Sequence, residues 1–188
     1  MLIIFTGHGK GKTTAALGQA ARLVGRGKRA LMIQFIKGPW KSGEDRLLMH
    51  QRPAFGAVSE TKDAVSTPRA FEIRKRGLGF VGILDDHTPF PEHKKAAEMA
   101  LKEAEDEIQK NLWDLIILDE VNNAVHLNLL SAEEVLRVVA LSAKEKFIIL
   151  TGRDAPEAFL KSADLATEMK ELKHPFNDGV MAKIALEF

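Results

Sequence analysis

The sequence predicts an α/β fold in which a mostly parallel sheet carries helices on both faces. Short segments rich in Ile, Leu and Phe alternate with segments of helical periodicity. Strands that are apolar throughout are typical of a sheet covered on both sides, and their alternation with helices indicates parallel strands joined by right-handed crossovers. Four segments are expected to be strands: Leu2–Phe5, Ala30–Phe35, Leu115–Leu118 and Phe147–Leu150.

The helices expected between these strands follow from periodicity and from end signals. Residues 12–25 form the first, which stops near the glycines at 25 and 27. Residues 92–112 form the second. A third begins at Ser131, which can cap an acidic first turn, and runs to about Ala143. The second helix carries one apolar stripe among charged residues: Ala97, Leu101, Ala104, Ile108 and Leu112.

Residues 38–91 show no clear periodicity and hold most of the prolines and many charges. A long irregular stretch in a compact domain is usually a functional loop or a disordered one. We therefore expect one domain over residues 1–188, with a substrate-binding insertion at about 38–91. Within it a short strand is expected near Gly79–Ile83, and a last strand is expected at Ala182–Phe188.

Composition narrows the function classes. The chain has 188 residues, of which 45% are hydrophobic, a net charge of +1 and no cysteine. The absence of cysteine excludes a disulfide framework, a thiolate metal site and a cysteine nucleophile. The balanced charge gives no strong attraction to nucleic acid or to an anionic membrane. Because no stretch resembles a signal peptide or a membrane span, we expect a soluble, cytoplasmic protein that binds neither nucleic acid nor membrane.

The most informative stretch joins the first expected strand to the first expected helix, and it is Gly-His-Gly-Lys-Gly-Lys-Thr-Thr. A strand, a glycine loop and a helix in this order are typical of the phosphate-loop (P-loop) NTPase fold, in which backbone N–H groups cradle a polyphosphate. The lysine before the two threonines can reach the terminal phosphates, and the first threonine can offer its hydroxyl to Mg²⁺. The residues predicted to bind ATP here are Gly7, His8, Gly9, Lys10, Gly11, Lys12, Thr13 and Thr14.

The glycine spacing departs from the usual pattern. In G-x-x-x-x-G-K-[ST] the first glycine would fall at Thr6, whereas here the glycines stand at 7, 9 and 11 and Lys10 adds a second positive charge. The alternative interpretation is a turn before a surface helix. The position, the flanking strand and the Gly-Lys-Thr-Thr sequence favour the phosphate loop.

An acidic pair, Asp119 and Glu120, follows the third expected strand. In open parallel sheets ligands bind beyond the carboxyl ends of the strands, so this pair is expected at the same edge as the phosphate loop. One or both carboxylates can hold Mg²⁺ directly or through water; the alternative is a helix-capping pair. Arg153 follows the fourth expected strand, where it could face the triphosphate or remain a surface residue. The histidines outside the loop show no metal-ligand pattern.

A series of short stretches extends over nearly the whole chain. Each is weak alone, but their order and spacing are specific: Phe5–Thr14, Gln34–Trp40 with Gly43-Glu44, Gly79-Phe80, Leu118–Glu120, Leu150–Arg153, Ala163–Met169, Lys173–Phe176 with Gly179, and Leu186–Phe188. By these motifs the sequence resembles the phosphate-loop ATP:corrinoid adenosyltransferases, a family with a RecA-like fold. The glycine pattern at 7, 9 and 11 is the one that this family shows.

The resemblance implies transfer of the 5′-deoxyadenosyl group of ATP to Co(I) of a corrinoid, with release of triphosphate, in adenosylcobalamin synthesis or salvage. Because Co(I) is itself the nucleophile, the protein positions C5′ and stabilises charge on the leaving triphosphate. By match, Lys12 and Phe80 are the catalytic residues, and Thr13 and Glu120 hold Mg²⁺ or Mn²⁺. Phe80 is expected against the corrin face opposite the adenosyl group, where it displaces the lower cobalt ligand. ATP is expected to lie reversed in the loop, and the expected partners are an electron-donating reductase and a second subunit of a homodimer.

Two departures from the family stand out. Many members have Phe-x-Trp where this chain has Phe80, Val81 and Gly82, so the apolar wedge is reduced to Phe80 unless Phe90 or Trp40 substitutes. Some members also carry an N-terminal extension over the site, whereas this sequence begins on its first strand. We therefore expect the closing element to come from elsewhere, such as a second subunit.

Two other functions stay open at this point. A RecA-like ATPase would use Glu120 to activate water. A non-catalytic corrinoid or nucleotide carrier would keep the fold without the reaction.

Overall fold

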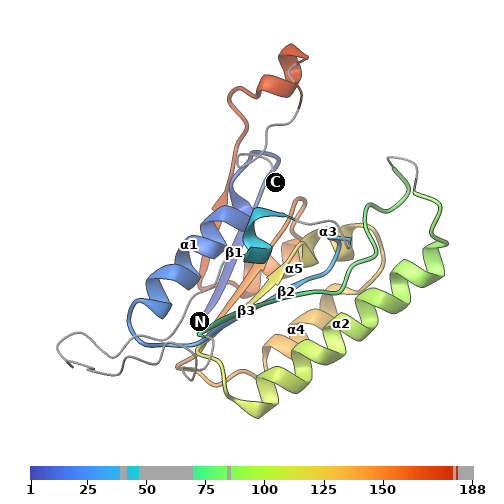
Figure 1. Ribbon diagram of the computed structural model, residues 1–188. Coiled ribbons are helices and arrows are strands. Elements are labelled where there is room, and N and C mark those ends of the chain that lie inside the picture. The colour runs from blue at the N-terminus through green and yellow to red at the C-terminus, as the bar shows by residue number, and fades with distance from the viewer. Residues whose placement is uncertain (39–41, 47–69, 84–85, 180, 182–188) are drawn as a thin grey trace.

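The computed structural model describes residues 1–38, 42–46, 70–83, 86–179 and 181. Among these residues, six strands form one sheet in the order β3-β2-β4-β5-β1-β6, and all neighbours are parallel (Figure 1). This confirms the predicted α/β fold. The strands are β1 (Leu2–Thr6), β2 (Ala30–Gln34), β3 (Phe71–Lys75), β4 (Leu115–Asp119), β5 (Phe147–Thr151) and β6 (Leu165–Glu168).

Helices cover both faces of the sheet (Figure 1). Helix α1 packs on one face through Ala16, Ala20 and Val24, while the other α-helices contribute to the apolar core on the opposite face. No described helix is both long and apolar enough to cross a bilayer. The helices are α1 (Lys12–Val24), α2 (Phe90–Lys110), α3 (Val121–His126), α4 (Ala132–Val139) and α5 (Glu157–Ser162), with 3₁₀ turns η1 (Gly43–Arg46) and η2 (Pro175–Asp178).

The central strands are apolar throughout because both of their faces are covered. Every residue of β2 and β4 is buried. Along β4, Ile117 packs on the α1 side, whereas Ile116 and Leu118 pack on the side of α2 and α4. This alternation is the packing that continuous apolar strands predict.

Two strands lie outside the predicted set, and one predicted strand is wrong. The edge strand β3 has the sequence Phe-Glu-Ile-Arg-Lys, and every residue of the other edge strand, β6, is exposed. Edge strands bury little, so neither one shows the continuous apolar run that marks β2 and β4. The strand expected near Gly79–Ile83 is instead an irregular stretch of bends. The strand expected at Ala182–Phe188 lies outside the described residues.

The predicted helices lie in the correct parts of the chain, but some of their predicted end residues differ from those in the structure. Ser131 forms the expected capping box with Glu134, yet α4 ends at Val139, before the predicted Ala143. Leu112 does not join the apolar stripe of α2, because the left-handed Asn111 (φ 53°) ends that helix and leaves Leu112 52% exposed. The short helices α3 and α5 have six residues each and were not predicted.

The strand order places the phosphate loop and the acidic pair, which are the two predicted halves of the nucleotide site, at the same end of the strands. Strand β5 lies between β1, which leads into the phosphate loop, and β4, which ends at the acidic pair. The carboxyl ends of parallel strands meet at the same edge, where ligands of open α/β sheets bind. The chain after β6 then leaves the sheet and extends away from it with η2 (Figure 1).

Two glycine substitutions are expected to change stability in opposite directions. Gly18→Ala should raise the free energy of unfolding by about 0.5–1 kcal/mol, because glycine inside a helix is less favourable than alanine and a Cβ there meets nothing within 4 Å. Gly77→Ala should lower it, because its Cβ would lie 2.3 Å from the carbonyl carbon of Ile36. Urea unfolding measures both, and a stabilised Gly77→Ala would contradict this packing.

Candidate active site

The phosphate loop joins β1 to α1 and surrounds the ammonium group of Lys12. Gly11, at φ 116°, precedes the first helical residue. Lys12 Nζ donates to the carbonyl oxygens of Gly7 at 2.8 Å and Gly9 at 2.9 Å, and Lys12 is only 8% exposed. Burial lowers the pKa of Lys12, and the nearby Glu120 acts in the opposite direction. The loop therefore holds a positive charge at the N-terminus of α1, where the free N–H groups of a helix favour an anion.

The shifted glycines have a packing reason that the sequence did not reveal. A Cβ on Gly7 would lie 2.5 Å from the carbonyl oxygen of Met169, and one on Gly9 would lie 2.7 Å from the same oxygen. The Gly9 N–H donates to this oxygen at 2.7 Å. The chain that follows β6 thus presses directly on the phosphate loop. Thr6, where the usual pattern has its first glycine, instead accepts a hydrogen bond from the Ala155 N–H at 3.1 Å.

Asp119 is fully buried and is bound by three side chains from three other elements. Its Oδ1 accepts from Thr13 Oγ1 at 2.9 Å and from Thr151 Oγ1 at 2.7 Å, and its Oδ2 accepts from Gln34 Nε2 at 3.0 Å. This Asp119 cluster (Asp119, Thr13, Thr151 and Gln34) ties β4 to α1, β5 and β2. Asp119 and Thr13 were predicted as site residues, whereas Gln34 and Thr151 were missed. A polar residue that ends an apolar strand was the signal that could have found both.

Glu120 has a left-handed backbone (φ 62°) and stands at the start of α3. A non-glycine residue in this conformation costs on the order of 1–3 kcal/mol. Such residues are enriched at active sites, although a helix end such as Asn111 also adopts it. Its side chain makes no capping hydrogen bond, so the capping alternative is not supported. Burial, with a contribution from Asp119, raises the pKa of Glu120 to about 7, while Lys12, Lys37 and Arg153 act in the opposite direction.

Charged side chains also surround this edge of the sheet. Lys37 forms an ion pair with Glu44, and Lys75 pairs with Asp45 at 2.7 Å. His8 Nε2 lies 3.1 Å from Asp154 Oδ1. These pairs place both signs of charge beyond the carboxyl ends of β2 and β3 and on the phosphate loop.

The remaining predicted residues lie at the margin of the site. The backbone N–H of Arg153 donates to Asn123 Oδ1 at 2.6 Å, and Arg153 is exposed. Lys10 and Thr14 are exposed on the loop and on the first turn of α1. Phe80 lies on the segment that follows β3 and is 48% exposed. The loop, the acidic pair and the arginine therefore come together, whereas Phe80 lies apart from them, in the segment that follows the edge strand β3.

The donor set suits a hard cation that is held mostly by its substrate. No group of three or more His, Cys, Asp or Glu side chains that could hold a metal is found in the described parts of the chain. Mg²⁺ usually takes only one or two carboxylates from a protein and completes its shell with phosphate oxygens and water. The oxygens of Thr13 and of the acidic pair meet that requirement.

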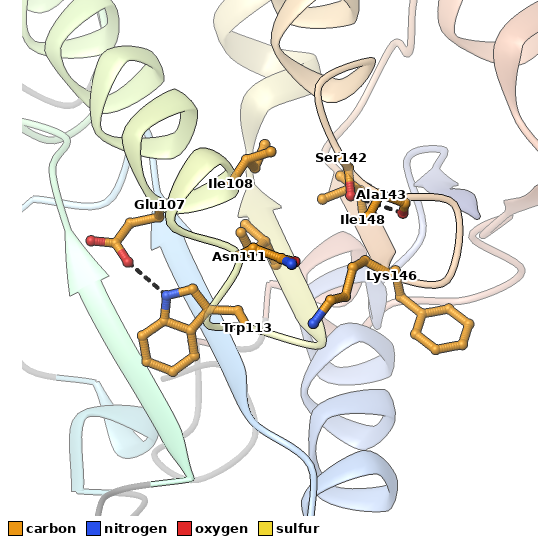
Figure 2. A pocket seen from close by; sticks show the side chains of 10 residues that line it. Glu107, Ile108, Asn111, Trp113, Ser142, Ala143, Lys146 and Ile148 are labelled. Carbon is orange, nitrogen blue, oxygen red and sulfur yellow. Dashed lines mark hydrogen bonds between the residues drawn. The ribbon is translucent and has the colours of Figure 1, made fainter.

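The cavity in Figure 2 lies at the other end of the strands from the phosphate loop, beside the starts of β4 and β5. Trp113 Nε1 donates to Glu107 Oε2 at 2.6 Å, and the Arg29 guanidinium lies 4.5 Å from the centre of the Trp113 ring. These contacts fasten the end of α2 to the sheet. Because nucleotides bind at the carboxyl ends of parallel strands, we assign this cavity to packing.

The sequence comparisons agree over the whole chain. A family model described as "ATP:corrinoid adenosyltransferase BtuR/CobO/CobP" matches residues 1–188. The chain is 34% identical over 189 residues to the corrinoid adenosyltransferase CobA of Salmonella typhimurium, and 32% identical over 188 residues to the corrinoid adenosyltransferase of Escherichia coli K12. Both alignments cover 100% of this chain and 85% of the relative. A corrinoid adenosyltransferase of Sinorhizobium sp. is 32% identical over 189 residues, with 80% of its length covered.

Glu120→Gln is expected to stabilise the protein at high pH only. The folded protein binds the Glu120 proton more tightly than the unfolded chain does, because its pKa is raised from 4.5 to about 7. Wild-type stability should therefore fall as pH rises through this window, whereas the neutral amide has no such dependence. Urea unfolding should show the variant favoured by roughly 3 kcal/mol at about pH 8, and by less than about 1 kcal/mol at about pH 5.

The matched control for this measurement is Glu157→Gln, because the side chain of Glu157 on α5 is 78% exposed. It should shift stability equally at both pH values. A Glu120→Gln difference that does not change with pH would contradict the raised pKa.

Proposed function

Because this chain belongs to the ATP:corrinoid adenosyltransferase family BtuR/CobO/CobP, we propose that it transfers the 5′-deoxyadenosyl group of ATP to Co(I) of a corrinoid. The cobalt–carbon bond forms as the C5′–oxygen bond breaks, and the electron pair of that bond leaves with triphosphate. The reaction serves adenosylcobalamin synthesis or salvage. The observation that supports the proposal is that the family model matches residues 1–188. In this chain, the phosphate loop and the acidic pair also lie at the same end of the strands.

In this proposal the phosphate loop stabilises the charge of the leaving triphosphate. Backbone N–H groups at the start of α1 and the side chains of Lys10 and Lys12 donate to phosphate oxygens. The buried ammonium of Lys12 exchanges its bonds to loop carbonyls for bonds to phosphate. Arg153, at the margin of the site, adds a further positive charge. Positioning and charge stabilisation are what this reaction needs, because the nucleophile belongs to the corrinoid.

We assign the metal to Thr13 and Glu120, and we take it to be Mg²⁺, with Mn²⁺ as the alternative. When bound, such a cation neutralises charge on the triphosphate. Glu120 is the candidate for direct ligation, since its carboxylate makes no capping bond. Asp119 already accepts hydrogen bonds from three side chains, so its proposed role is to hold Thr13 and to reach the metal through water.

Phe80 and the segment around it are assigned to the corrinoid. Phe80 follows the carboxyl end of β3, which points in the same direction as the strand end that leads into the phosphate loop, and it is 48% exposed. An apolar side chain in that place can pack on a corrin face and exclude the lower cobalt ligand. The proposed substrate-binding insertion at 38–91 includes strand β3, so it combines a strand of the sheet with the segments on either side.

The proposed partners are a second subunit and an electron-donating reductase. Strand β6 is an exposed sheet edge, the chain beyond it extends away from the sheet (Figure 1), and Leu172 in that chain is 88% exposed. Exposed edges and exposed apolar side chains are typical places for a second copy to bind. A reductase is proposed because Co(I) has to be produced by reduction.

An ATPase remains the alternative function, and the raised pKa of Glu120 favours it, because a carboxylate poised near neutral pH can act as a base. The products separate the two. The protein is incubated with ATP, Mg²⁺ and a chemically reduced corrinoid, and adenosylated corrinoid and intact triphosphate should appear in equal amounts. ADP and phosphate in their place would establish hydrolysis and overturn the transferase proposal.

Lys12→Ala is expected to weaken ATP binding at least about tenfold, because it removes a charge-assisted bond to the phosphates. Isothermal titration with ATP and Mg²⁺ measures the affinity. Lys161→Ala is the matched control, since Lys161 is 72% exposed on α5 and forms an ion pair with Glu157 on the surface of that helix. An unchanged affinity in Lys12→Ala would contradict the proposed cradle.

Phe80→Ala should slow the reaction that starts from Co(II) about tenfold or more, and the reaction given chemically prepared Co(I) by less than about threefold. The reason is that loss of the lower ligand eases reduction of Co(II) and matters little once Co(I) exists. Initial rates of adenosylated corrinoid formation measure both. Equal losses from the two starting states would speak against the wedge.

A further inference from the structure

Asp86 holds the segment that carries Phe80 to the first turn of α2. Its Oδ2 accepts from the Gly82 N–H at 2.9 Å and lies 2.9 Å from His93 Nε2, while its Oδ1 accepts from the Thr88 N–H at 3.0 Å. A carboxylate only accepts hydrogen bonds, so His93 donates from Nε2. The side chain of His93 is 3% exposed and that of Asp86 is 9% exposed. We call Asp86, His93 and the two backbone N–H groups the Asp86 clasp.

The other end of the same segment is held by backbone contacts to the last residue of β2 and to the chain just after it. The Gly77 N–H donates to the carbonyl oxygen of Gln34 at 3.2 Å, and the Gly79 N–H donates to that of Ile36 at 3.0 Å. Gly77 packs so closely on Ile36 that no side chain would fit there. Phe80 therefore lies between one attachment made by β2 and a second made by the Asp86 clasp.

The clasp also explains the glycine at position 82. Gly82 has φ +69°, a conformation that favours glycine, and its N–H is the donor to Asp86. A Cβ on Gly82 would meet nothing within 4 Å, so the backbone conformation and not a lack of space selects glycine.

We propose that Asp86 and His93 are positioning residues for Phe80, which fix the segment 77–83 so that the phenyl ring meets the corrinoid in one orientation. The inference rests on the proposed function, because it gives Phe80 a corrinoid to meet. Neither Asp86 nor His93 touches a substrate in this proposal.

The Asp86 clasp is suited to this role because its carboxylate stays ionised down to acidic pH. Bonds from the backbone N–H groups of Gly82 and Thr88 lower the pKa of Asp86 to about 2, so the carboxylate stays charged. Charge-assisted hydrogen bonds are stronger than neutral ones. His93 is buried within the first turn of α2, and its own backbone is fixed by the helix, so the attachment has a rigid support.

The test compares Asp86→Ala, His93→Gln and the control His87→Gln in the full chain. His87 is the exposed neighbour of Asp86 and receives the same substitution as His93. Two readouts are used: hydrogen exchange of the peptide that covers residues 77–83, and the rates of adenosylation from Co(II) and from chemically prepared Co(I). ATP affinity is measured in parallel, because the clasp should not affect it.

Asp86→Ala should speed exchange in this peptide at least about tenfold and slow the Co(II) reaction about tenfold, with the Co(I) reaction changed by less than about threefold. His93→Gln can still donate to Asp86, so it should retain most of the wild-type rate, and the control should behave as wild type. The double variant Phe80→Ala/Asp86→Ala should be no slower than Phe80→Ala alone, because a residue that acts only through Phe80 has nothing left to position.

Contrary outcomes separate the inference from the proposed function. Wild-type exchange in Asp86→Ala, equal losses from Co(II) and Co(I), or additive losses in the double variant would overturn the positioning role while the enzyme stays active. If Asp86→Ala does not fold, wild-type discrimination between Co(II) and Co(I) in His93→Leu would overturn it. A wild-type chain that forms no adenosylated corrinoid would overturn the proposed function, and the inference with it.

Discussion

The buried carboxylate of Asp119 is the interaction on which the arrangement of the site depends. An ionised carboxylate is costly to bury unless hydrogen bonds compensate it. Here the compensation comes from Thr13, Thr151 and Gln34, so one charge draws together α1, β5 and β2 at the end of β4. The same bonds that make Asp119 tolerable also set the distance between the phosphate loop and Glu120.

The edge of the sheet holds a balance of charges that suits a nucleotide and its cation. Lys12 is buried among loop carbonyls and opposes the acidic pair, and burial raises the pKa of Glu120. In the proposed complex, a polyphosphate would bring negative charge to the lysine side of the site, and a divalent cation would bring positive charge to the carboxylate side. Binding of both ligands would offset the cost of the buried ammonium group in one half of the site and of the buried carboxylates in the other. The left-handed backbone of Glu120 fits this picture, since strained residues persist where function requires them.

Glycine is favoured for different reasons in the two segments that we propose to bind the substrates. In the phosphate loop, Gly7 and Gly9 leave room for the backbone that follows β6. At Gly82 the surrounding space is open, and the positive φ is what favours glycine. A glycine pattern alone therefore does not distinguish close approach from backbone conformation, and the neighbouring segment decides which reason applies.

The sequence by itself determined the parallel α/β fold, the central strands, the phosphate loop and the acidic pair, because each of these is written in neighbouring residues: a continuous apolar run, or a motif of fixed spacing. Only the tertiary structure decided what depends on contacts between distant segments. The edge strands β3 and β6 bury too few side chains to show a continuous apolar run. The partners of Asp119 come from three separate elements, and the role of Asp86 depends on its contacts with Gly82 and His93. Such contacts form only when the chain folds, so no local stretch of the sequence records them.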